Sequence, residues 1–350
     1  MGLPSGTFNQ SYAQDMAIFR TRMQWIMLLA FLAFLFTCPL YSSDTILTIM
    51  TIIGITIIAV LGLNILTGYC GQISLGHAGF MAVGAYTSGI LCAKLGWSFW
   101  AALPCAALAA GIAGLIFGLP SLRVKGFYLI MATIAAHFII IWVILQLYSV
   151  TGGANGLAVP RPEIGGFVLK SKASYFYLVM IIACLATFFA KNIVRTKAGR
   201  AFIAIRDNDL AAEVMGVNLW SYKLLAFFIG CVYAGVAGSL LVHYIAFASV
   251  DQFPFMNSVW YLGMLIVGGM GSTMGAIFGA VSLKVLDELV TVSGPVLAAA
   301  FPAIAVQAAA SLSLIMRGLV IIVFLIFEPR GLAHRWEMVK AYYRLWPFSH

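Results

Sequence analysis

The chain has 350 residues, of which 63% are hydrophobic and only 9% are charged, and its mean hydropathy is +1.02. Because a soluble protein of this length carries roughly a quarter charged residues, most of this surface cannot face water. The net charge of +9 arises from basic residues in short loops between apolar stretches, which indicates membrane topology and argues against nucleic-acid binding.

Apolar stretches that can each form a membrane-crossing helix recur from Trp25 to Phe327. We predict an all-α polytopic membrane protein with about ten transmembrane helices, some of them discontinuous, because ~20 apolar residues cross the hydrocarbon core. A polar tail precedes the first stretch and no small-residue cleavage site follows it, so we expect a retained first helix. The predicted spans are 25–41, 45–68, 78–97, 98–119, 127–149, 175–193, 223–247, 258–270, 272–292 and 308–327.

The placement of basic residues predicts the orientation of these spans. If the N-terminus is cytoplasmic, most Lys and Arg residues fall in inside segments, as the positive-inside rule requires. An even number of spans then puts both termini in the cytoplasm. The outside segments hold Lys94, Arg161, Lys170 and Lys172. The expected division is a cytoplasmic tail over 1–24, a transmembrane domain over 25–327 and a cytoplasmic tail over 328–350.

Two glycine-rich segments interrupt the apolar pattern, at 68–79 and 268–275. Broken helices survive at membrane depth only where their free backbone groups are buried in protein or line a wet cavity, and in transporters they often form the binding site. Close helix packing through small residues is the alternative explanation. Packing alone does not require the polar residues of the first segment, so we predict that both segments line a substrate pathway: Gln72, Ser74, Gly76, His77, Gly79, Gly269, Gly271 and Ser272.

Residues 191–222, between the sixth and seventh predicted spans, are charged yet keep helical character. Residues 201–205 are compatible with a short helix, and Asp207 or Asn208 can cap a second one over 209–215 by accepting backbone N–H bonds. Gly216 ends that helix, since glycine tolerates the left-handed conformation. Two short helices along the membrane surface are suited to contact with a soluble partner protein.

Residues that could carry chemistry are few and scattered. His77 and His137 each lack a second histidine, cysteine or carboxylate at helical spacing, which argues against a metal site. The six cysteines form no CxxC pair, and no GxxxxGK[ST] motif provides P-loop ATP hydrolysis. We therefore expect no catalytic residue, no metal and no cofactor. An integral membrane enzyme that uses His77 or His137 is an alternative that metal content or turnover would reveal.

Arg317 lies in the last predicted span, ~15 Å from its cytoplasmic end at 1.5 Å per residue. An unpaired charge at that depth is costly. We expect an ion pair with Asp287 or Glu288 on the preceding span, and a contact with a substrate carboxylate is the alternative.

Several motifs occur in an order typical of one protein family. GYCGQISLGHAGFMAVGAYTSGIL, at 68–91, resembles the signature of bacterial branched-chain amino acid permeases of ABC importers. Their order resembles that of the LivM-type subunit, and the resemblance covers 45–332. The further segments are SLRVKGFYLIMATIA (121–135), TGGANGL (151–157), GRAFIAIRDNDLAAEVMGVN (199–218), GGMGSTMGAIFGA (268–280) and EPRGL (328–332).

The resemblance implies a non-catalytic permease subunit of an ATP-driven importer in the bacterial inner membrane, with the ABC importer permease fold. The implied partners are a homologous LivH-type permease subunit, two cytoplasmic ATPase subunits and a periplasmic substrate-binding protein, and the implied substrates are branched-chain (hydrophobic) amino acids. Residues 199–218 are similar to the segment that couples ABC permeases to their ATPases, with an EAA-type motif. The implied coupling residues are Arg200, Arg206, Asp207, Asp209, Ala211, Ala212, Glu213 and Gly216.

Two features depart from the family pattern. The N-terminal tail is longer than expected, and Arg317 stands where we expect an apolar or aromatic residue. Within the same class, an importer of urea, short amides or aromatic acids is the alternative. Outside it, an ion-coupled secondary carrier or channel predicts transport by the isolated chain. The scarcity of deep carboxylates argues against that carrier, since ion-coupled carriers place ionisable groups inside the membrane.

Overall fold

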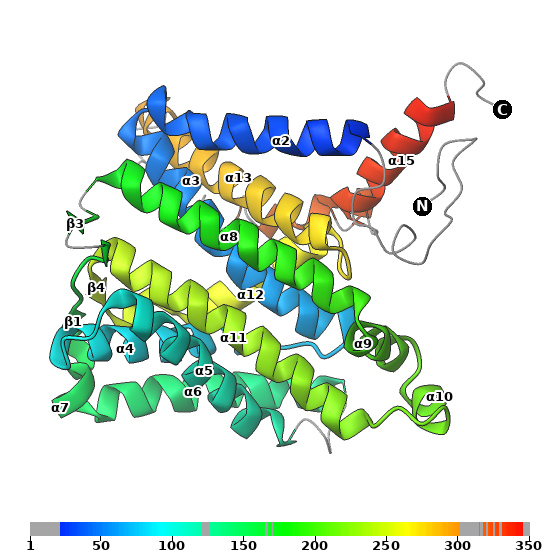
Figure 1. The fold of residues 1–350 in the computed structure, drawn as a ribbon, viewed down its shortest axis with the longest axis horizontal. Helices are drawn as coiled ribbons and strands as arrows, with labels where there is room; N and C mark the ends of the chain where they lie inside the picture. The colour runs from blue at the N-terminus through cyan, green and yellow to red at the C-terminus, as the bar shows by residue number, and fades with distance from the viewer. Residues whose placement is uncertain are drawn as a thin grey trace.

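The computed structural model describes residues 22–120, 126–164, 167–169, 171–300, 315, 318–319, 321–324, 326–328 and 331–345. Long helices run side by side along one direction and make up most of the described chain (Figure 1). Arg317 and most of the predicted span 308–327 lie outside the described residues. The long helices are α2 (Arg22–Thr37), α3 (Asp44–Leu63), α4 (His77–Lys94), α5 (Phe99–Gly118), α6 (Phe127–Gln146), α8 (Lys172–Arg195), α11 (Leu219–Ile245), α12 (Phe255–Gly268), α13 (Thr273–Ala300) and α15 (Leu332–Leu345).

Length and apolarity qualify five of the described helices as membrane spans, or six if one bent pair counts as a span. The bent pair, Val250–Gly268 and Thr273–Val292, turns by 118° at residues 269–272. The all-α polytopic class is thus confirmed, although the described residues do not reach the expected count of about ten. The five spans are Asp44–Tyr69, Phe99–Gly118, Phe127–Gln146, Lys172–Arg195 and Leu219–Ile245.

Predicted and observed boundaries differ most in α13, which continues to Ala300 beyond the predicted end at 292. The sequence Gly294-Pro295 indicates a helix end in a soluble protein. Membrane helices tolerate glycine and proline because neighbouring helices and side chains satisfy the freed backbone groups. The glycine–proline pair therefore does not end α13, which continues to Ala300.

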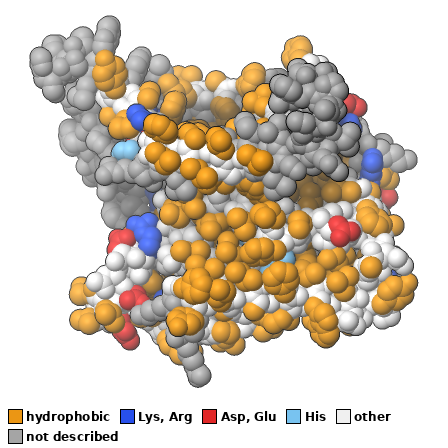
Figure 2. Space-filling model, turned by 180° about the vertical axis from the view of Figure 1, so that it is seen from behind, with side chains coloured by type: hydrophobic (Ala, Val, Ile, Leu, Met, Phe, Trp, Pro, Cys, Tyr) orange, Lys and Arg blue, Asp and Glu red, His pale blue; other side chains and the backbone are white. Residues whose placement is uncertain are grey.

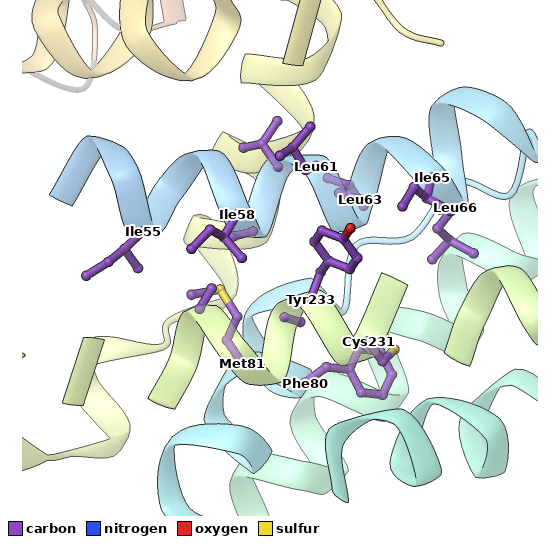
Figure 3. Close-up of a cluster of buried hydrophobic side chains, with 14 of the residues drawn as sticks. Ile55, Ile58, Leu61, Leu63, Ile65, Leu66, Phe80, Met81, Cys231 and Tyr233 are labelled. Carbon is purple, nitrogen blue, oxygen red and sulfur yellow. The ribbon is translucent and has the colours of Figure 1, made fainter. Parts of the chain in front are cut away.

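The centre of the molecule is the packing of α3 on α4 and α11. Ile58 of α3, Met81 of α4 and Tyr233 of α11 belong to one buried cluster (Figure 3). At Gly84 and Gly235 the backbones of α4 and α11 come so close that a Cβ atom on Gly84 would collide with the Cα atom of Gly235. Small residues of this kind allow membrane helices to pack by close backbone approach. Helix α4 is therefore a buried helix, enclosed by the spans around it.

The two ends of the helix array carry different structures (Figure 1). At one end, which we call the β1 end, short elements join the helices, and β1 pairs antiparallel with β4 while β2 pairs with β3. At the other, the α9 end, lie α9 (Lys197–Asp207) and α10 (Asp209–Val214). The remaining short elements are η1 (Cys38–Leu40), η2 (Asn64–Tyr69), α7 (Tyr148–Thr151), η4 (Gly153–Asn155), β1 (Leu157–Ala158), β2 (Glu163–Ile164), β3 (Phe167–Val168), β4 (Phe247–Ala248) and η5 (Val250–Gln252).

Hydrophobic side chains cover the middle of the face shown in Figure 2, and the charged side chains gather towards its two sides. Several large apolar side chains are more than half exposed, among them Phe138, Trp142 and Phe188. Soluble monomeric proteins rarely expose a contiguous apolar surface of this extent to water. The exposed belt thus fits a protein whose sides contact lipid or another membrane subunit.

Candidate coupling site and the glycine-rich breaks

Two short helices with a bend connect α8 to α11, as the sequence of 191–222 predicts. Helix α9 buries Ala201, Phe202 and Ile205 against the spans, while Arg200 and Asp207 are exposed. Its N-terminus is capped by Thr196, whose hydroxyl accepts a hydrogen bond from the Gly199 backbone N–H. One face of α9 is thus fixed to the membrane domain and the other is open.

Helix α10 is defined by a side-chain cap at its start and a glycine at its end. The Asn208 side chain accepts a hydrogen bond from Ala211 N at 3.1 Å, which selects Asn208 over Asp207 as the cap. Gly216 follows the helix with φ of +86°, the left-handed conformation expected of it. Ala212 is the one buried residue of α10. An ion pair of 3.7 Å joins Asp209 to Lys223 at the start of α11.

The outer surface of α10 and the turn after it is apolar. Val214 and Met215 are 86% and 83% exposed, and Leu210 and Trp220 are each more than half exposed. Beside them is a shallow groove of 490 Å³, which Glu213 and Gly216 line together with Val217, Asn218, Leu219, Trp220 and Lys223. We call Leu210, Val214, Met215 and Trp220 the docking surface. Exposed apolar clusters with a polar rim mark sites of protein contact.

The two glycine-rich breaks meet each other at the α9 end. The first follows α3, whose last turn widens into the π-helical turn η2. The second is the turn between α12 and α13. Asn64 joins them, because its side-chain nitrogen donates to Ser272 O and its side-chain oxygen accepts from Gly271 N, each at 3.0 Å. The Tyr69 and Thr273 hydroxyls add a hydrogen bond of 3.2 Å.

Arg206, near the end of α9, contacts both glycine-rich breaks. Its Nη1 donates to Gly68 O at 3.1 Å, and Gly271 lies so close that a Cβ atom there would be 2.7 Å from Nη1. The other guanidinium nitrogens, Nε and Nη2, bind Asp207 Oδ1 at 3.0 and 2.9 Å. We call Asn64, Gly68, Arg206, Gly271 and Ser272 the break junction. It connects α9 to both breaks.

A third element also contacts the second break. Gly331, just before α15, has φ of +78°, and its Cα lies so close to Gly269 that any side chain at 331 would overlap the Gly269 backbone. Gly269, assigned to the substrate pathway from sequence, is therefore covered from the α9 end by the segment that leads into α15.

The polar residues of the first break are enclosed within this chain. Gln72, Ser74 and His77 are each at most 4% exposed, and His77 Nε2 lies 2.9 Å from the Ala59 carbonyl oxygen of α3. The Gln72 side-chain amide is buried and has no hydrogen-bond partner among the described residues. None of the three lines the groove beside α10, and their place in a substrate pathway stays a prediction.

Helix α4 begins inside the protein, and neighbouring helices supply the caps that its own sequence lacks. Ala78 N donates to the Ser258 hydroxyl of α12 at 2.9 Å, and Leu75 N donates to the Thr133 hydroxyl of α6 at 3.1 Å. Gly76 lies against the Thr133 backbone, and Gly79 lies against His137. These contacts are those of helix packing, which is the alternative explanation that the sequence left open.

Sequence reasoning missed Asn64, Thr133 and Ser258, all of which sit within apolar helices. A signal existed for Asn64, because an amide side chain in a 26-residue apolar span needs a partner. For the hydroxyls there was none, since serine and threonine commonly bond to their own helix backbone. Among the described residues, no group of three or more His, Cys, Asp or Glu side chains is arranged to hold a metal ion.

Comparison with known proteins gives one family. The family model described as "Branched-chain amino acid transport system / permease component" matches residues 45–325. The high-affinity branched-chain amino acid transport system permease protein LivM of Escherichia coli K12 is 33% identical over 293 residues, which cover 77% of this chain and 69% of that protein. No solved structure matches the chain.

More distant relatives include both types of permease subunit. A probable branched-chain amino acid transport permease protein LivM of Methanocaldococcus jannaschii is 26% identical over 191 residues, or 52% of this chain and 53% of that protein. The high-affinity permease protein LivH of Escherichia coli K12 is 26% identical over 243 residues, or 63% of this chain and 77% of that protein. The chain is thus similar to both, and more so to LivM of Escherichia coli.

Replacing Asn64 tests the break junction. In Asn64→Ala, the half-buried Gly271 N loses its acceptor, while Ser272 O keeps the hydrogen bond from Ala276 N. We therefore expect a loss at the lower end of the about 1–3 kcal/mol that an unsatisfied buried group costs. We expect a lower thermal unfolding midpoint of the purified protein in detergent. Asn64→Asp, which keeps the acceptor and loses the donor, should lie between. The control is Asn155→Ala, because Asn155 is exposed at the β1 end; an equal midpoint for N64A and N155A would contradict the junction.

The reactivity of Cys70 tests whether the first glycine-rich break is closed to solvent. Cys70 lies just beyond the span Asp44–Tyr69 and is 2% exposed, and burial raises the pKa of its thiol to about 12. The thiol is therefore protonated at neutral pH. Maleimide labelling of Cys70 should be slow at pH 7 and rise about tenfold per pH unit to pH 9, because the thiolate is the reactive form. An added exposed cysteine, Ser221→Cys, is the control, and equal rates at pH 7 would show that Cys70 is accessible.

Proposed function

This chain belongs to the family of branched-chain amino acid transport system permease components, and from that premise we propose that it is the membrane-spanning subunit of an ATP-driven importer of branched-chain amino acids. Such a subunit is non-catalytic and provides the route through the membrane. In this proposal ATP hydrolysis belongs to partner subunits.

The proposed assembly contains a homologous LivH-type permease subunit, two cytoplasmic ATPase subunits and a periplasmic substrate-binding protein. The similarity of the chain to both LivM and LivH supports a paired homologous subunit. The protein is a multi-pass protein of the inner membrane. We propose that the α9 end faces the cytoplasm, which agrees with the basic residues that sequence analysis assigns to that side.

One observation carries the ATPase part of the proposal: the docking surface is apolar, exposed and backed by the break junction. Val214 and Met215 extend outward, while Arg206 on the adjoining helix bonds to the Gly68 carbonyl inside the membrane domain. A force applied to α10 from outside therefore reaches both breaks through α9. The apolar contact itself binds the ATPase, and the glycine residues allow the backbone to adjust.

The transport cycle that follows is alternating access. The ATPases close on ATP and move the two coupling segments together, so that the permease helices shift between two packings. The change from one packing to the other needs no large rearrangement, because glycine contacts such as that of Gly84 with Gly235 let two helices slide past each other. The binding protein releases its amino acid at the β1 end, and hydrolysis resets the packing.

Charged substitutions on the docking surface test the binding step. Val214→Asp and Met215→Asp should fold normally, because both positions are exposed, yet each places an unpaired charge in an apolar interface. A loss of about 1.4 kcal/mol or more corresponds to tenfold weaker association. We expect at least that decrease in the ATPase subunit that co-purifies with the permease. Leu95→Asp, at the β1 end, is the matched control, and undiminished co-purification of V214D would contradict the docking surface.

Arg206 separates binding from transmission. Arg206→Gln removes the bond to Gly68 O while leaving the docking surface intact, so we expect normal ATPase co-purification and at least about tenfold slower leucine uptake in proteoliposomes containing the whole importer, the equivalent of about 1.4 kcal/mol. Arg206→Lys keeps one donor and should be intermediate. Lys197→Gln, exposed at the other end of α9, is the control. Uptake by the permease alone, without ATPases, would overturn the importer assignment.

A further inference from the structure

The turn between α12 and α13 is a bend built on glycine. The two helices meet at 118° over residues 269–272. Gly269 and Gly271 have φ of +112° and +74°, values that strain a residue with a side chain. Glycine also has the greatest backbone freedom of the amino acids, so this turn can act as a hinge. The contacts around it therefore decide whether the angle between α12 and α13 can change.

Different parts of the chain hold the two ends of this turn. At its far end, Gly271 N donates to Asn64 Oδ1 at 3.0 Å, and Gly271 lies against the guanidinium of Arg206 on α9. At its start, Gly269 lies against Gly331, where an added Cβ atom would be 2.5 Å from Gly269 Cα. The coupling segment thus contacts one end of the hinge, and the segment that leads into α15 covers the other.

Residues 331–336 form a stiff unit together with Glu328. Gly331 N donates to Glu328 O at 2.9 Å, and His334 N donates to Gly331 O at 3.1 Å. The Arg335 guanidinium forms an ion pair with the Glu328 carboxylate across the turn. All these bonds lie within the C-terminal part of the chain. They therefore fix the shape of the unit without tying it to the rest of the membrane domain.

The unit contacts the bend by packing alone. The Trp336 ring meets the Phe278 ring of α13 edge-on, with centroids 6.0 Å apart, and Ala333 is 8% exposed. Figure 1 shows α15 in red at the α9 end of the molecule. Among the described residues, no hydrogen bond or ion pair joins 331–336 to α12, α13 or the turn between them. Such contacts can separate without leaving a buried polar group unsatisfied.

We propose that residues 331–336 are a strap, which holds the bend between α12 and α13 at its present angle and must release Phe278 before that angle changes during transport. The transport part of this inference rests on the proposed function. The strap contacts the hinge at Gly269 and one arm at Phe278, so α13 cannot swing about the hinge while both contacts persist. Because Arg206 contacts the other end of the turn, a movement of α9 acts on the strap through the hinge. Trp336 is 44% exposed, which leaves its ring room to move away.

Reversible cross-linking of the strap to α13 tests whether it must release. The variant is Phe278→Cys/Trp336→Cys in the whole importer, with the six native cysteines of this chain replaced by alanine. It is treated with a short bis-methanethiosulfonate, and ATP-dependent leucine uptake is measured in proteoliposomes. We expect uptake to fall at least about tenfold and to return when dithiothreitol removes the cross-link. The matched control is Met338→Cys/Tyr342→Cys, one turn apart on α15, whose cross-link should leave uptake unchanged.

Labelling of Cys70 gives a second measurement, which needs no transport. In the otherwise native importer, Trp336→Ala loosens the second break, which Asn64 joins to the π-helical turn just before Cys70. We expect maleimide labelling of Cys70 at pH 7, followed by peptide mass spectrometry, to rise about threefold to tenfold, the effect of losing one aromatic pair. Trp336→Phe keeps a ring and should be intermediate. Trp97→Ala, exposed at the β1 end, is the control and should label like the wild type.

The contrary outcomes are distinct. Undiminished uptake by the fully cross-linked importer would show that α15 and α13 move as one body, which overturns the strap. Failure of the cysteine pair to cross-link would show that the two rings are not neighbours. Equal labelling of Cys70 in W336A and the wild type would show that α15 does not hold the break. An untreated importer without ATP-dependent uptake would overturn the proposed function alone, because the labelling experiment judges the strap without transport.

Discussion

A helix that breaks inside a membrane exposes backbone N–H and C=O groups where no water can satisfy them, and this constraint organises the protein. Two such breaks lie among the described residues, and side-chain hydrogen bonds join them. Asn64, on the π-helical turn that leads into the first break, accepts from Gly271 N and donates to Ser272 O, which also accepts from Ala276 N, and Arg206 satisfies the carbonyl of Gly68. The break junction is therefore needed first of all to satisfy backbone groups inside the bilayer, apart from any part that it has in transport.

The same contacts make the coupling segment part of the membrane domain. Because Arg206 of α9 donates to Gly68 O, α9 cannot shift without stretching that charged hydrogen bond or carrying the break with it. Helix α10 is different, since it is held by Ala212 and the pair of Asp209 with Lys223. One short helix thus transmits, and the other presents an apolar surface. Binding and transmission are therefore separable by mutation.

The sequence predicted the helices and their ends, and it predicted few of the contacts between them. The positions of α9 and α10, the Asn208 cap and the glycine at 216 follow from local rules of capping and left-handed backbone, so they were predictable. The contact of Asn64 with Gly271 spans 207 residues, and no local pattern encodes it. The partners of the backbone at the α4 N-terminus were unpredictable for the same reason, because Thr133 and Ser258 lie on distant helices. The assignment of its glycines and His77 to a substrate pathway stays a prediction.

The long separation between Asn64 and its partners sets an order for biosynthesis. The span Asp44–Tyr69 enters the bilayer before the partners of its Asn64 amide exist, because the second break is made only after α11 and α12 have followed. During that interval the Asn64 amide needs a temporary hydrogen-bond partner, whereas Gly68 O can already bind Arg206, which precedes α11 in the chain. A chain that ends before the second break therefore keeps the Asn64 amide without its final partners inside an apolar span, which is costly in a bilayer.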